Sequence, residues 1–505
     1  MRRHLSFSIL LIILLAAPAG VGQEVALTIM QTTDLHGFIT RGDEAESGGL
    51  LRLATLIDRE RQNLPDDTEI IIDCGDTISG TVESLPDRGV LILDMLKAIG
   101  YDVWVPGNHE LDFGVPHLAT LVQQMRNHIL CGNLTLYPGR QEETTFPAWK
   151  LIEKNGLRVA VIGMSASYTA NWYWGETKAS FSAAAAVDSL LSHIKEIRAV
   201  KPDFTILAIH QGWHPNDDRG VNEIQAIAKK LPEIDLILGG HTHRPNPGDK
   251  INHHTWYAQA GRHADALAVA RVRFDLRTRH VTSLESRLVP ATADVPLHKG
   301  LQQTFAKRLD TARVFSRKGV GTLGAPLQAG QIPGVDSGTS ECVSRAIAEA
   351  VKAPVVIHGK LSNASFPAGP FSEGDLFALI PYENTIGTLL LTPRQLKDVL
   401  NEQLANRGSY TVNGLWGIRA ICENNQVARC VWADGTGFST GRIKVAFHSY
   451  ALAGGGGRFP VLRALAENPR CEPVETGLST RDIVRTYLKT HGAVAVSPEK
   501  WFIEK

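Results

Sequence analysis

The sequence predicts an α/β protein in which a large N-terminal domain precedes a smaller α+β domain. From about Val25 to Leu284, short apolar runs alternate with helical patterns, and several runs are apolar throughout, as strands buried on both faces are. Polar clusters follow these runs at their C-terminal ends, where α/β sheets carry function. From about Lys318 a different pattern begins, with helices, short strands and the Gly-rich loop "AGGGGRFP".

Each apolar run predicts one strand, and the patterns between the runs predict helices. The strands are "VALTIMQTTD" (25–34), "EIIIDCGD" (69–76), "DVWVPGN" (102–108), "HILCGN" (128–133), "LRVAVIGMS" (157–165), "FTILAIHQG" (204–212) and "IDLILGGHTH" (234–243). Helices are expected at 48–62, 88–100, 183–200, 298–315, 340–352 and 392–405. These elements predict a first domain at 25–285, a linker with a helix at 286–317 and a second domain at 318–505.

The N-terminus is typical of an export signal at residues 1–22. Arg2, Arg3 and His4 precede the apolar run "LSFSILLIILLAA", and small residues allow cleavage after Ala19 or Gly22. The run is short for a membrane span, so we expect no stable membrane insertion, with an uncleaved anchor as the alternative. The formal net charge of zero argues against binding to nucleic acid. We therefore expect a periplasmic or extracellular protein.

Export permits disulfides, but six cysteines in 505 residues are too few for a disulfide scaffold. Cys422 and Cys430 flank "ENNQVAR", which suits a hairpin turn, and they are the best candidates for a bond. The sequence does not give the connectivity.

Polar residues that suit metal binding stand at five of the predicted strand ends. They are Asp34 and His36 in "TTDLH", Asp73 and Asp76 in "DCGD", Asn108, His109 and Asp112 in "GNHELD", His210 in "AIHQGW", and His241 and His243 in "GGHTH". One such fragment is usually a chance match or a structural cap. Five in order, each ending a predicted strand of one sheet, predict a common site.

The chemistry of these side chains points to two metal ions. Imidazole nitrogen and carboxylate oxygen are ligands for Zn²⁺, Mn²⁺ or Fe. Seven ligands exceed one tetrahedral site but suit two ions that share a bridging carboxylate, about 3.5–4 Å apart, as in phosphatases. Cys74 is interpreted as a small buried residue rather than a thiolate ligand.

These residues resemble the five sequence blocks of the calcineurin-like metallophosphoesterases. "GNHELD" and the long second domain narrow the resemblance to the exported 5′-nucleotidase family, which includes UDP-sugar hydrolases and 2′,3′-cyclic-nucleotide phosphodiesterases. The resemblance implies a β-sandwich flanked by helices (αββα) and then an α+β substrate-binding domain. It also implies hydrolysis of nucleotides or other small phosphate esters with two divalent metal ions.

The resemblance assigns a role to each matching position. It implies that Asp34, His36 and His243 hold one metal, that Asn108, His210 and His241 hold the other, and that Asp76 bridges them. His109 and Asp112 match the catalytic pair, in which the histidine lies beside the phosphate and the aspartate orients its ring. Glu110 is expected to brace the turn.

The second domain matches the family in part. The loop "GSYTVNGLWGI" puts Tyr410 at the first base-stacking position, and "YALAGGGGRFP" makes Phe459 the candidate for the second. Gly456 stands where the family usually has Asp, and Arg458 precedes Phe459. "IPYENT" matches a family segment, but Ser362 stands where the family has an Arg that helps to hold the substrate phosphate.

Three functions are compatible with this pattern. The first is an exported dinuclear 5′-nucleotidase. The second keeps the metals and changes the substrate to a cyclic nucleotide, a UDP-sugar, a generic phosphomonoester or a sulfur ester. The third is a secreted binding protein without catalysis, against which the complete ligand set argues.

Overall fold

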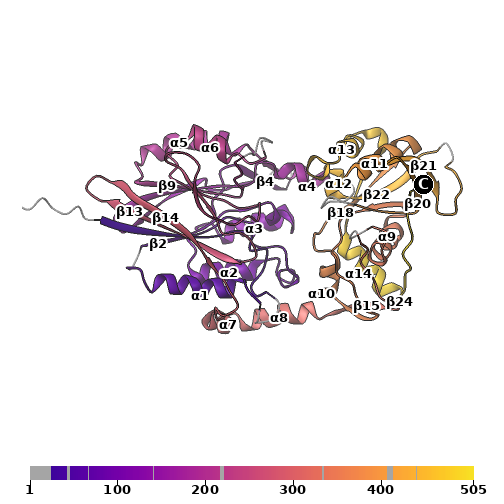
Figure 1. The fold of residues 1–505 in the computed structure, drawn as a ribbon, viewed down its shortest axis with the longest axis horizontal. Coiled ribbons are helices and arrows are strands. Elements are labelled where there is room, and N and C mark those ends of the chain that lie inside the picture. The colour runs from indigo at the N-terminus through magenta and orange to yellow at the C-terminus, as the bar shows by residue number, and fades with distance from the viewer. Residues whose placement is uncertain are drawn as a thin grey trace, which may run out of the picture.

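The computed structural model describes residues 24–504 except 42–45, 66–67, 140–141, 216–220, 332–334, 407–412 and 439–440. The chain forms two bodies that lie side by side along its long axis, the N-terminal one indigo to magenta and the C-terminal one orange to yellow (Figure 1). The predicted export signal at 1–22 lies outside the described residues. Among the helices that are described, none is both long and apolar enough to cross a membrane.

The first sheet of the N-terminal body has the strand order β14-β13-β1-β2-β3. Its strands are β1 (Glu24–Thr32), β2 (Glu69–Asp73), β3 (Val103–Trp104), β13 (Ala266–Asp275) and β14 (His280–Pro290). β1, β2 and β3 are parallel, with Thr32 beside Asp73 and Asp73 beside Trp104. The loops after these three strands therefore leave from the same edge of the sheet.

The second sheet has the order β11-β12-β10-β9-β7-β6. Its strands are β6 (Trp149–Lys154), β7 (Leu157–Met164), β9 (Phe204–Ile209), β10 (Leu236–Leu238), β11 (Asn246–Lys250) and β12 (Trp256–Gln259). β7, β9, β10 and β12 are parallel, so the ends of β9 and β10 also share one edge. A small sheet of β4 (Leu134–Gly139), β5 (Glu142–Thr145) and β8 (Phe181–Ala183) lies beside this body.

The two large sheets pack face to face and helices cover their outer faces. In the run "EIIID", Ile70 and Ile72 join the core between the sheets, whereas Ile71 joins the core under the helices, because strand side chains alternate. The helices are α1 (Leu50–Arg61), α2 (Val90–Ile99) and α3 (Val115–Gln124) on one face, and α5 (Ala186–Ala199) and α6 (Ile224–Lys230) on the other. The αββα architecture predicted from the resemblance is confirmed.

The C-terminal body is α+β, as predicted. Its main sheet has the order β19-β16-β22-β18-β23. The strands are β16 (Val355–His358), β18 (Thr385–Leu391), β19 (Gly414–Trp416), β22 (Ile443–His448) and β23 (Val474–Ser479). Smaller sheets are formed by β17 (Gly369–Ser372), β15 (Gly319–Leu323) and β24 (Ala493–Val494), and by β21 (Gln426–Trp432), β20 (Ile418–Glu423) and β25 (Phe502–Glu504). The helices around them include α9 (Gly338–Val351), α10 (Glu373–Leu379), α11 (Pro393–Ala405), α12 (Ser449–Leu452), α13 (Pro460–Ala466) and α14 (Thr480–Thr490).

Local signals define where these helices begin. Thr392 caps α11 in a capping box with Gln395, and a proline occupies the first turn, where its missing N–H costs nothing. Ser372 and Asp375 form the equivalent box at α10. Each cap satisfies backbone N–H groups that a helix leaves without an intrahelical partner.

Two segments connect the bodies. α7 (Lys299–Thr304) and α8 (Ala306–Ser316) run along one side, within the segment predicted as a linker. Arg308 of α8 binds Asp87 at 2.8 Å and Asp94 at 2.6 Å, which ties α8 to the N-terminal body. On the other side, the turn η3 (Thr169–Trp172) and α4 (Gly175–Ala179) reach the C-terminal body (Figure 1).

Two sequence predictions are corrected. The run "HILCGN" forms no strand: only Ile129 makes an isolated bridge, to Trp104, because β3 is just two residues long and offers little to pair with. No disulfide joins Cys422 and Cys430, and all six cysteines are thiols. A register shift after Ile421 places Cys422 opposite Val427 and Cys430 opposite Ala420, so the two cysteines do not face each other across the hairpin.

Candidate metal centre

The predicted ligands come together where the C-terminal edges of the two facing sheets meet. Asp34 and Asp76 follow β1 and β2 of the first sheet, whereas His210 and His241 follow β9 and β10 of the second. The prediction that these strand ends belong to one sheet is wrong. The site spans the edge of a sandwich, with each sheet supplying part of it.

The first group of potential ligands contains Asp34, His36 and His243, whose ligand atoms all lie within 4.8 Å of one another. Nε2 of His243 is 3.2 Å from Oδ1 of Asp34 and 3.0 Å from Nε2 of His36. Nδ1 of His36 donates to the Ser79 carbonyl at 3.0 Å, so Nε2 of the neutral ring carries a lone pair. This tautomer presents a nitrogen ligand to the group.

The second group contains Asp76, His210 and His241, again with ligand atoms within 4.8 Å of one another. Nδ1 of His210 donates to the Cys74 carbonyl at 2.7 Å, which leaves Nε2 as the ligand atom, 3.0 Å from Oδ2 of Asp76. Oδ2 of Asp76 is also 3.9 Å from Nε2 of His36. Asp76 therefore lies between the two groups, as a bridging carboxylate must.

The residues fit a pair of divalent ions. Oδ1 of Asn108 and Nε2 of His210 are buried atoms that have no hydrogen-bond partner within the described part of the chain. His210 is close to Asp76, but the two atoms lack the geometry of a hydrogen bond. Buried polar atoms without partners are costly unless an ion engages them. Imidazole nitrogens, carboxylates and an amide oxygen suit Zn²⁺, Mn²⁺ or Fe²⁺.

The backbone at the ligands is strained. Five of the assigned ligand residues have a left-handed backbone, namely Asp34 (φ 52°), His36 (48°), Asp76 (54°), His241 (70°) and His243 (58°). Non-glycine residues adopt this region rarely, and it clusters at functional sites where the surrounding fold holds it in place. The strain aims successive side chains in different directions: Leu35 enters the core under α1 while its two neighbours face the site.

Two glycines permit the close packing of these loops. A Cβ atom at Gly107 would lie 2.3 Å from Oδ1 of Asp76, and one at Gly240 would lie 2.4 Å from Oγ1 of Thr33 and 3.0 Å from Nδ1 of His210. Any side chain at either position would displace a ligand. The glycines that precede "NHE" and "HTH" are therefore required by packing.

The carboxylate of Glu110 holds the ligand loops together. It is fully buried and accepts backbone N–H groups from Asp76 at 2.9 Å, Thr77 at 2.7 Å, Ile78 at 3.2 Å and Gly107 at 2.5 Å. Burial, followed by the charge of Asp76, raises the pKa of Glu110 to about 7. Glu110 braces the turn, as the sequence analysis expected.

His109 and Asp112 lie at the margin of the centre. Nδ1 of His109 is 2.9 Å from Oδ2 of Asp112, which also accepts the hydroxyl of Ser79 at 2.8 Å. Burial opposes the charged ring, but the carboxylates of Asp112 and Asp76 outweigh it and raise the pKa of His109 to about 10. The ring centroid is 5.2 Å from that of His36, so a protonated imidazole stands beside the first ligand group.

Two histidine ligands and the bridging carboxylate have the protonation states that metals need. Burial lowers the pKa of His36 and of His241 to about 4, so both rings are neutral near pH 7. Burial opposes the ionised form of Asp76, but the charges of His210 and His109 outweigh it and hold the pKa of that carboxyl well below its usual range. Neutral imidazole and ionised carboxylate are the metal-binding forms. Burial opposes the charged ring of His210, but the carboxylate of Asp76 outweighs it and raises the pKa of His210 to about 9, so a metal must displace a proton there.

Comparisons with known proteins agree with this geometry. The calcineurin-like phosphoesterase family matches residues 27–245, and the 5′-nucleotidase C-terminal domain family matches residues 320–464. The chain joins a calcineurin-like phosphoesterase domain to a 5′-nucleotidase C-terminal domain. The recognition made from the sequence blocks is confirmed.

Curated relatives match over half of the chain or more. A 5′-nucleotidase of Vibrio parahaemolyticus is 24% identical over 522 residues, 93% of this chain and 90% of the relative. Protein UshA of Escherichia coli is 27% identical over 289 residues, 52% of each chain. The solved structure of a 5′-nucleotidase precursor from Thermus thermophilus has a TM-score of 0.70 at 18% identity and covers 95% of this chain and 99% of its own.

A second solved structure with this fold is that of an enzyme with a different name. The sulfate thiohydrolase SoxB of Thermus thermophilus has a TM-score of 0.61 at 19% identity, and the match covers 95% of this chain and 96% of SoxB. At this identity the likeness shows the fold alone.

The structure describes only one of the two residues predicted to stack on a base in the nucleotidase C-terminal domain. Tyr410 lies outside the described residues. Phe459 is 0% exposed and belongs to the core cluster around β18 and β22, and its ring would meet a Cβ atom on Gly455 at 2.3 Å. Phe459 fills the space under the Gly-rich loop and offers no face to a ligand, so its predicted position is corrected.

The sequence analysis missed aromatic residues around the phosphoesterase centre. Trp172 stacks on the His241 ring, with centroids 5.0 Å apart and an interplanar angle of 26°. The hydroxyl of Tyr173 donates to the Asn108 carbonyl at 3.0 Å. His263 lies 5.7 Å from His36 and 6.0 Å from His243, ring to ring. The segment "NWYW" at 171–174 has no period or motif that marks it, although its density of aromatics was a usable signal.

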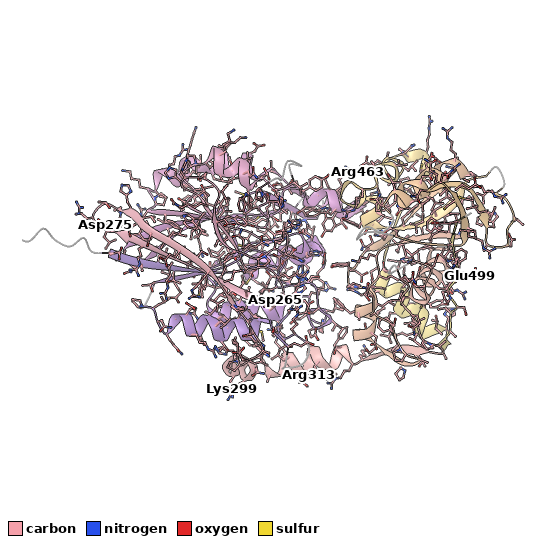
Figure 2. The ribbon with its side chains drawn as sticks, in the orientation of Figure 1. Asp265, Asp275, Lys299, Arg313, Arg463 and Glu499 are labelled. Atoms are coloured by element: carbon pink, nitrogen blue, oxygen red, sulfur yellow. The ribbon has the colours of Figure 1, made fainter. Side chains whose placement is uncertain are left out.

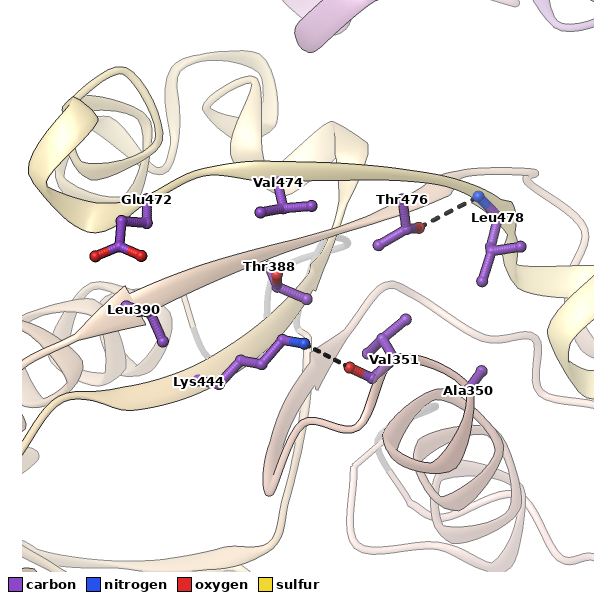
Figure 3. Close-up of a pocket in the computed structure, with 9 residues that line it drawn as sticks. All are labelled: Ala350, Val351, Thr388, Leu390, Lys444, Glu472, Val474, Thr476 and Leu478. Atoms are coloured by element: carbon purple, nitrogen blue, oxygen red, sulfur yellow. Dashed lines mark hydrogen bonds between the residues drawn. The ribbon is translucent and has the colours of Figure 1, made fainter.

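A groove on the nucleotidase C-terminal domain is separate from this centre. It has a volume of about 370 Å³ and lies between the end of α9 and the strands β18, β22 and β23 (Figure 3). Lys444 crosses it and donates to the Val351 carbonyl at 2.7 Å. None of the residues that line it belongs to the ligand groups, and we assign no chemistry to it.

Proposed function

We propose that the protein is an exported, dinuclear metal-dependent phosphohydrolase that releases phosphate from nucleoside 5′-monophosphates. The observation that carries the proposal is the position of Asp76 between two complete ligand groups, with the His109–Asp112 pair at their margin. The similarity to 5′-nucleotidases of Vibrio parahaemolyticus and Vibrio cholerae supports the 5′-nucleotidase activity. Export rests on the signal-like residues 1–22, and the domain limits at 25–285, 286–317 and 318–505 are part of the proposal.

In this proposal each ligand group holds one ion. Asp34, His36 and His243 would hold the first, Asn108, His210 and His241 would hold the second, and Asp76, which lies between the groups, would be shared. Divalent ions bound here supply positive charge that acidifies water and polarises a phosphoryl group. The metals are Zn, Mn or Fe, all of which accept this donor set.

The protein's own contribution comes from His109. Its Nδ1 is engaged by Asp112, so the proton that reaches a substrate is the one on Nε2. A protonated ring beside the first ligand group stabilises charge that develops on the phosphoryl oxygens, or donates a proton to the departing alkoxide. Asp112 fixes the tautomer, and Ser79 fixes Asp112 from the other side.

The nucleotidase C-terminal domain supplies the substrate's position. Its α10 contacts η1 (Val82–Ser84), which follows the Asp76 loop, so the two domains meet near the centre. Position 362, where the family has a cation, is a serine, and its hydroxyl accepts the Ala364 N–H at 3.1 Å. We infer that the phosphate of a nucleotide is held chiefly by the metals and His109.

A substrate panel on metal-loaded protein tests the proposal. AMP, UMP, 2′,3′-cyclic AMP, UDP-glucose, p-nitrophenyl phosphate and a thiosulfate ester would be compared with Zn²⁺ and Mn²⁺. We expect the highest kcat/KM for the 5′-monophosphates. If the protein hydrolyses p-nitrophenyl phosphate but no nucleotide, its natural substrate is another ester. If it hydrolyses none of these compounds with any metal, it is a binding protein. N-terminal sequencing of the secreted chain tests the cleavage site.

A further inference from the structure

The segment 172–176 connects the centre to the nucleotidase C-terminal domain. Trp172 stacks on His241, and Trp174 packs into the core of the other domain, where a Cβ atom on Gly387 would lie 2.7 Å from its ring. The backbone N–H of Glu176 donates to Glu475 at 2.7 Å. These contacts fix the position of Trp172 relative to both domains.

The Gly-rich loop of the C-terminal domain ends against Trp172. Gly454 to Gly457 all have positive φ, and the turn η4 (Gly455–Gly457) contacts η3. A Cβ atom at Gly456 would lie 2.9 Å from the hydroxyl of Tyr450, 3.5 Å from Nη2 of Arg458 and 3.7 Å from Nε1 of Trp172. Three polar groups therefore surround one point that carries no side chain.

The chemistry of these groups favours an acceptor at that point. The indole N–H and the guanidinium are donors only, and Arg458 also donates to the hydroxyl of Tyr450 at 2.8 Å. Within the described residues, no carboxylate lies within 4.0 Å of the Arg458 guanidinium, and Nε1 of Trp172 donates no hydrogen bond. The nearby Glu402 is engaged by the N–H groups of Val461 at 2.6 Å and Leu462 at 3.1 Å.

We propose that Trp172, Tyr450 and Arg458 form a subsite for a second anionic group of the substrate, such as a phosphate or carboxylate on its leaving group. This proposal rests on the phosphohydrolase function and narrows its substrate class. The anionic group lies one indole ring away from His241, so the substrate spans the metals and the Gly-rich loop. Gly456 provides the space, and Arg458 provides the charge.

Paired substrates and variants test the subsite. AMP has one phosphate, whereas adenosine 3′,5′-bisphosphate presents a second one, and p-nitrophenyl phosphate reports on the centre alone. Arg458→Gln should lower kcat/KM for the bisphosphate by about ten- to a hundredfold, the worth of one charge-assisted hydrogen bond. Turnover of p-nitrophenyl phosphate should change by less than about twofold.

A second variant fills the subsite with a competing carboxylate. Gly456→Asp keeps a residue that tolerates the left-handed backbone and places its carboxylate among the three groups. The wild type should have a higher kcat/KM for the bisphosphate than for AMP, and Gly456→Asp should abolish this difference. Calorimetric titration of the bisphosphate should also show weaker binding to the variant. The control is Arg463→Gln, which removes the same charge from α13, the helix on which Figure 2 labels Arg463. Arg463 pairs with Glu467 at 3.0 Å.

The outcomes separate this inference from the proposed function. Equal losses for all three esters in Arg458→Gln, or no loss for the bisphosphate, would overturn the subsite while leaving the phosphohydrolase in place. An equal loss in Arg463→Gln would assign the effect to general surface charge and also overturn it. A wild-type protein without any esterase activity would overturn the function itself.

Discussion

Nε2 of His36 and Nε2 of His243 lie 3.0 Å apart, although the two rings come from different sheets. Two nitrogen lone pairs at this distance repel each other unless a proton or a cation lies between them. Asp34, 3.2 Å from His243, adds a carboxylate to the same point. A divalent ion satisfies all three groups at once, which a single proton does not.

Metal removal should therefore destabilise the protein as well as inactivate it. The purified chain should carry close to two divalent ions, and chelation should abolish ester hydrolysis and lower Tm, because the ions bind the folded state only. Asp76→Asn should lower both metal content and kcat. Elemental analysis and thermal unfolding measure these effects, and full activity in the chelated protein would contradict the dinuclear centre.

His109→Ala should separate chemistry from metal binding. His109 is not among the ligand residues, so metal content should stay within about a tenth of the wild-type value. We expect kcat for p-nitrophenyl phosphate to fall by about 10²–10⁴-fold, the usual contribution of a positioned acid. Asp112→Asn should cost less, because the ring remains. Loss of one metal from His109→Ala would instead make His109 a ligand.

Glu110→Gln should weaken metal binding and lower stability, although Glu110 is not itself a metal ligand. One oxygen of the carboxylate becomes an NH₂ group that faces backbone donors, so some of the four N–H bonds are lost. We expect a loss of at least about 2 kcal/mol in the free energy of unfolding and weaker metal binding. The control is Glu24→Gln, which removes an exposed pair with Arg273 that is worth less than about 1 kcal/mol. Equal effects in both variants would contradict the bracing role.

Ser362→Arg should improve the use of nucleotides if the C-terminal domain docks them. A new charge-assisted hydrogen bond should lower KM for AMP by about ten- to a hundredfold, and KM for p-nitrophenyl phosphate should fall less. Ser362→Gln controls for side-chain size. A wild-type KM for AMP that is already in the low micromolar range, unchanged by the new arginine, would show that another group holds the phosphate.

The C-terminal domain should lose stability in mild acid. His358 and His448 are 1% and 4% exposed, and burial lowers their pKa values to about 4 and about 3. Both titrate near 6.5 in an unfolded chain, so protons favour unfolding. Their contribution is complete above about pH 6.5 and is lost as pH falls toward 4. Each can add up to about 1.36 kcal/mol per pH unit.

Urea unfolding between pH 7.5 and 4.5 measures this effect. His448→Gln removes one of the two groups and keeps a side chain able to reach Asn413, the partner of His448 at 3.1 Å. The variant should show a shallower loss of stability with falling pH than the wild type. Parallel curves would show that the acid sensitivity comes from other residues.

The sequence predicts the ligands better than their surroundings. Asp34, His36 and the "HTH" pair could be found because they directly follow buried strands, and such strands are marked by apolar runs. An apolar run does not indicate which sheet its strand joins, so the prediction that all these strands belong to one sheet was wrong. That choice depends on pairings between strands far apart in the chain.

Aromatic positions that depend on distant packing were harder to predict. Phe459 follows a run of glycines whose positive φ values turn the chain, and the turn sends the ring into the core. Trp172 acquires its position from a stacking contact with His241, 69 positions later in the chain. Neither contact leaves a local pattern, because each is set by how two distant segments pack.

The left-handed backbone at the ligands implies a trade of stability for activity. Each non-glycine residue in this region costs about 1 kcal/mol, so the five positions together burden the metal-free fold with several kcal/mol. Glycine at His241 would relieve strain while deleting a ligand, and such a variant would be inactive yet more resistant to heat than the metal-free parent. Selection for thermal tolerance alone would therefore favour glycine at these strained positions and so remove the metal ligands.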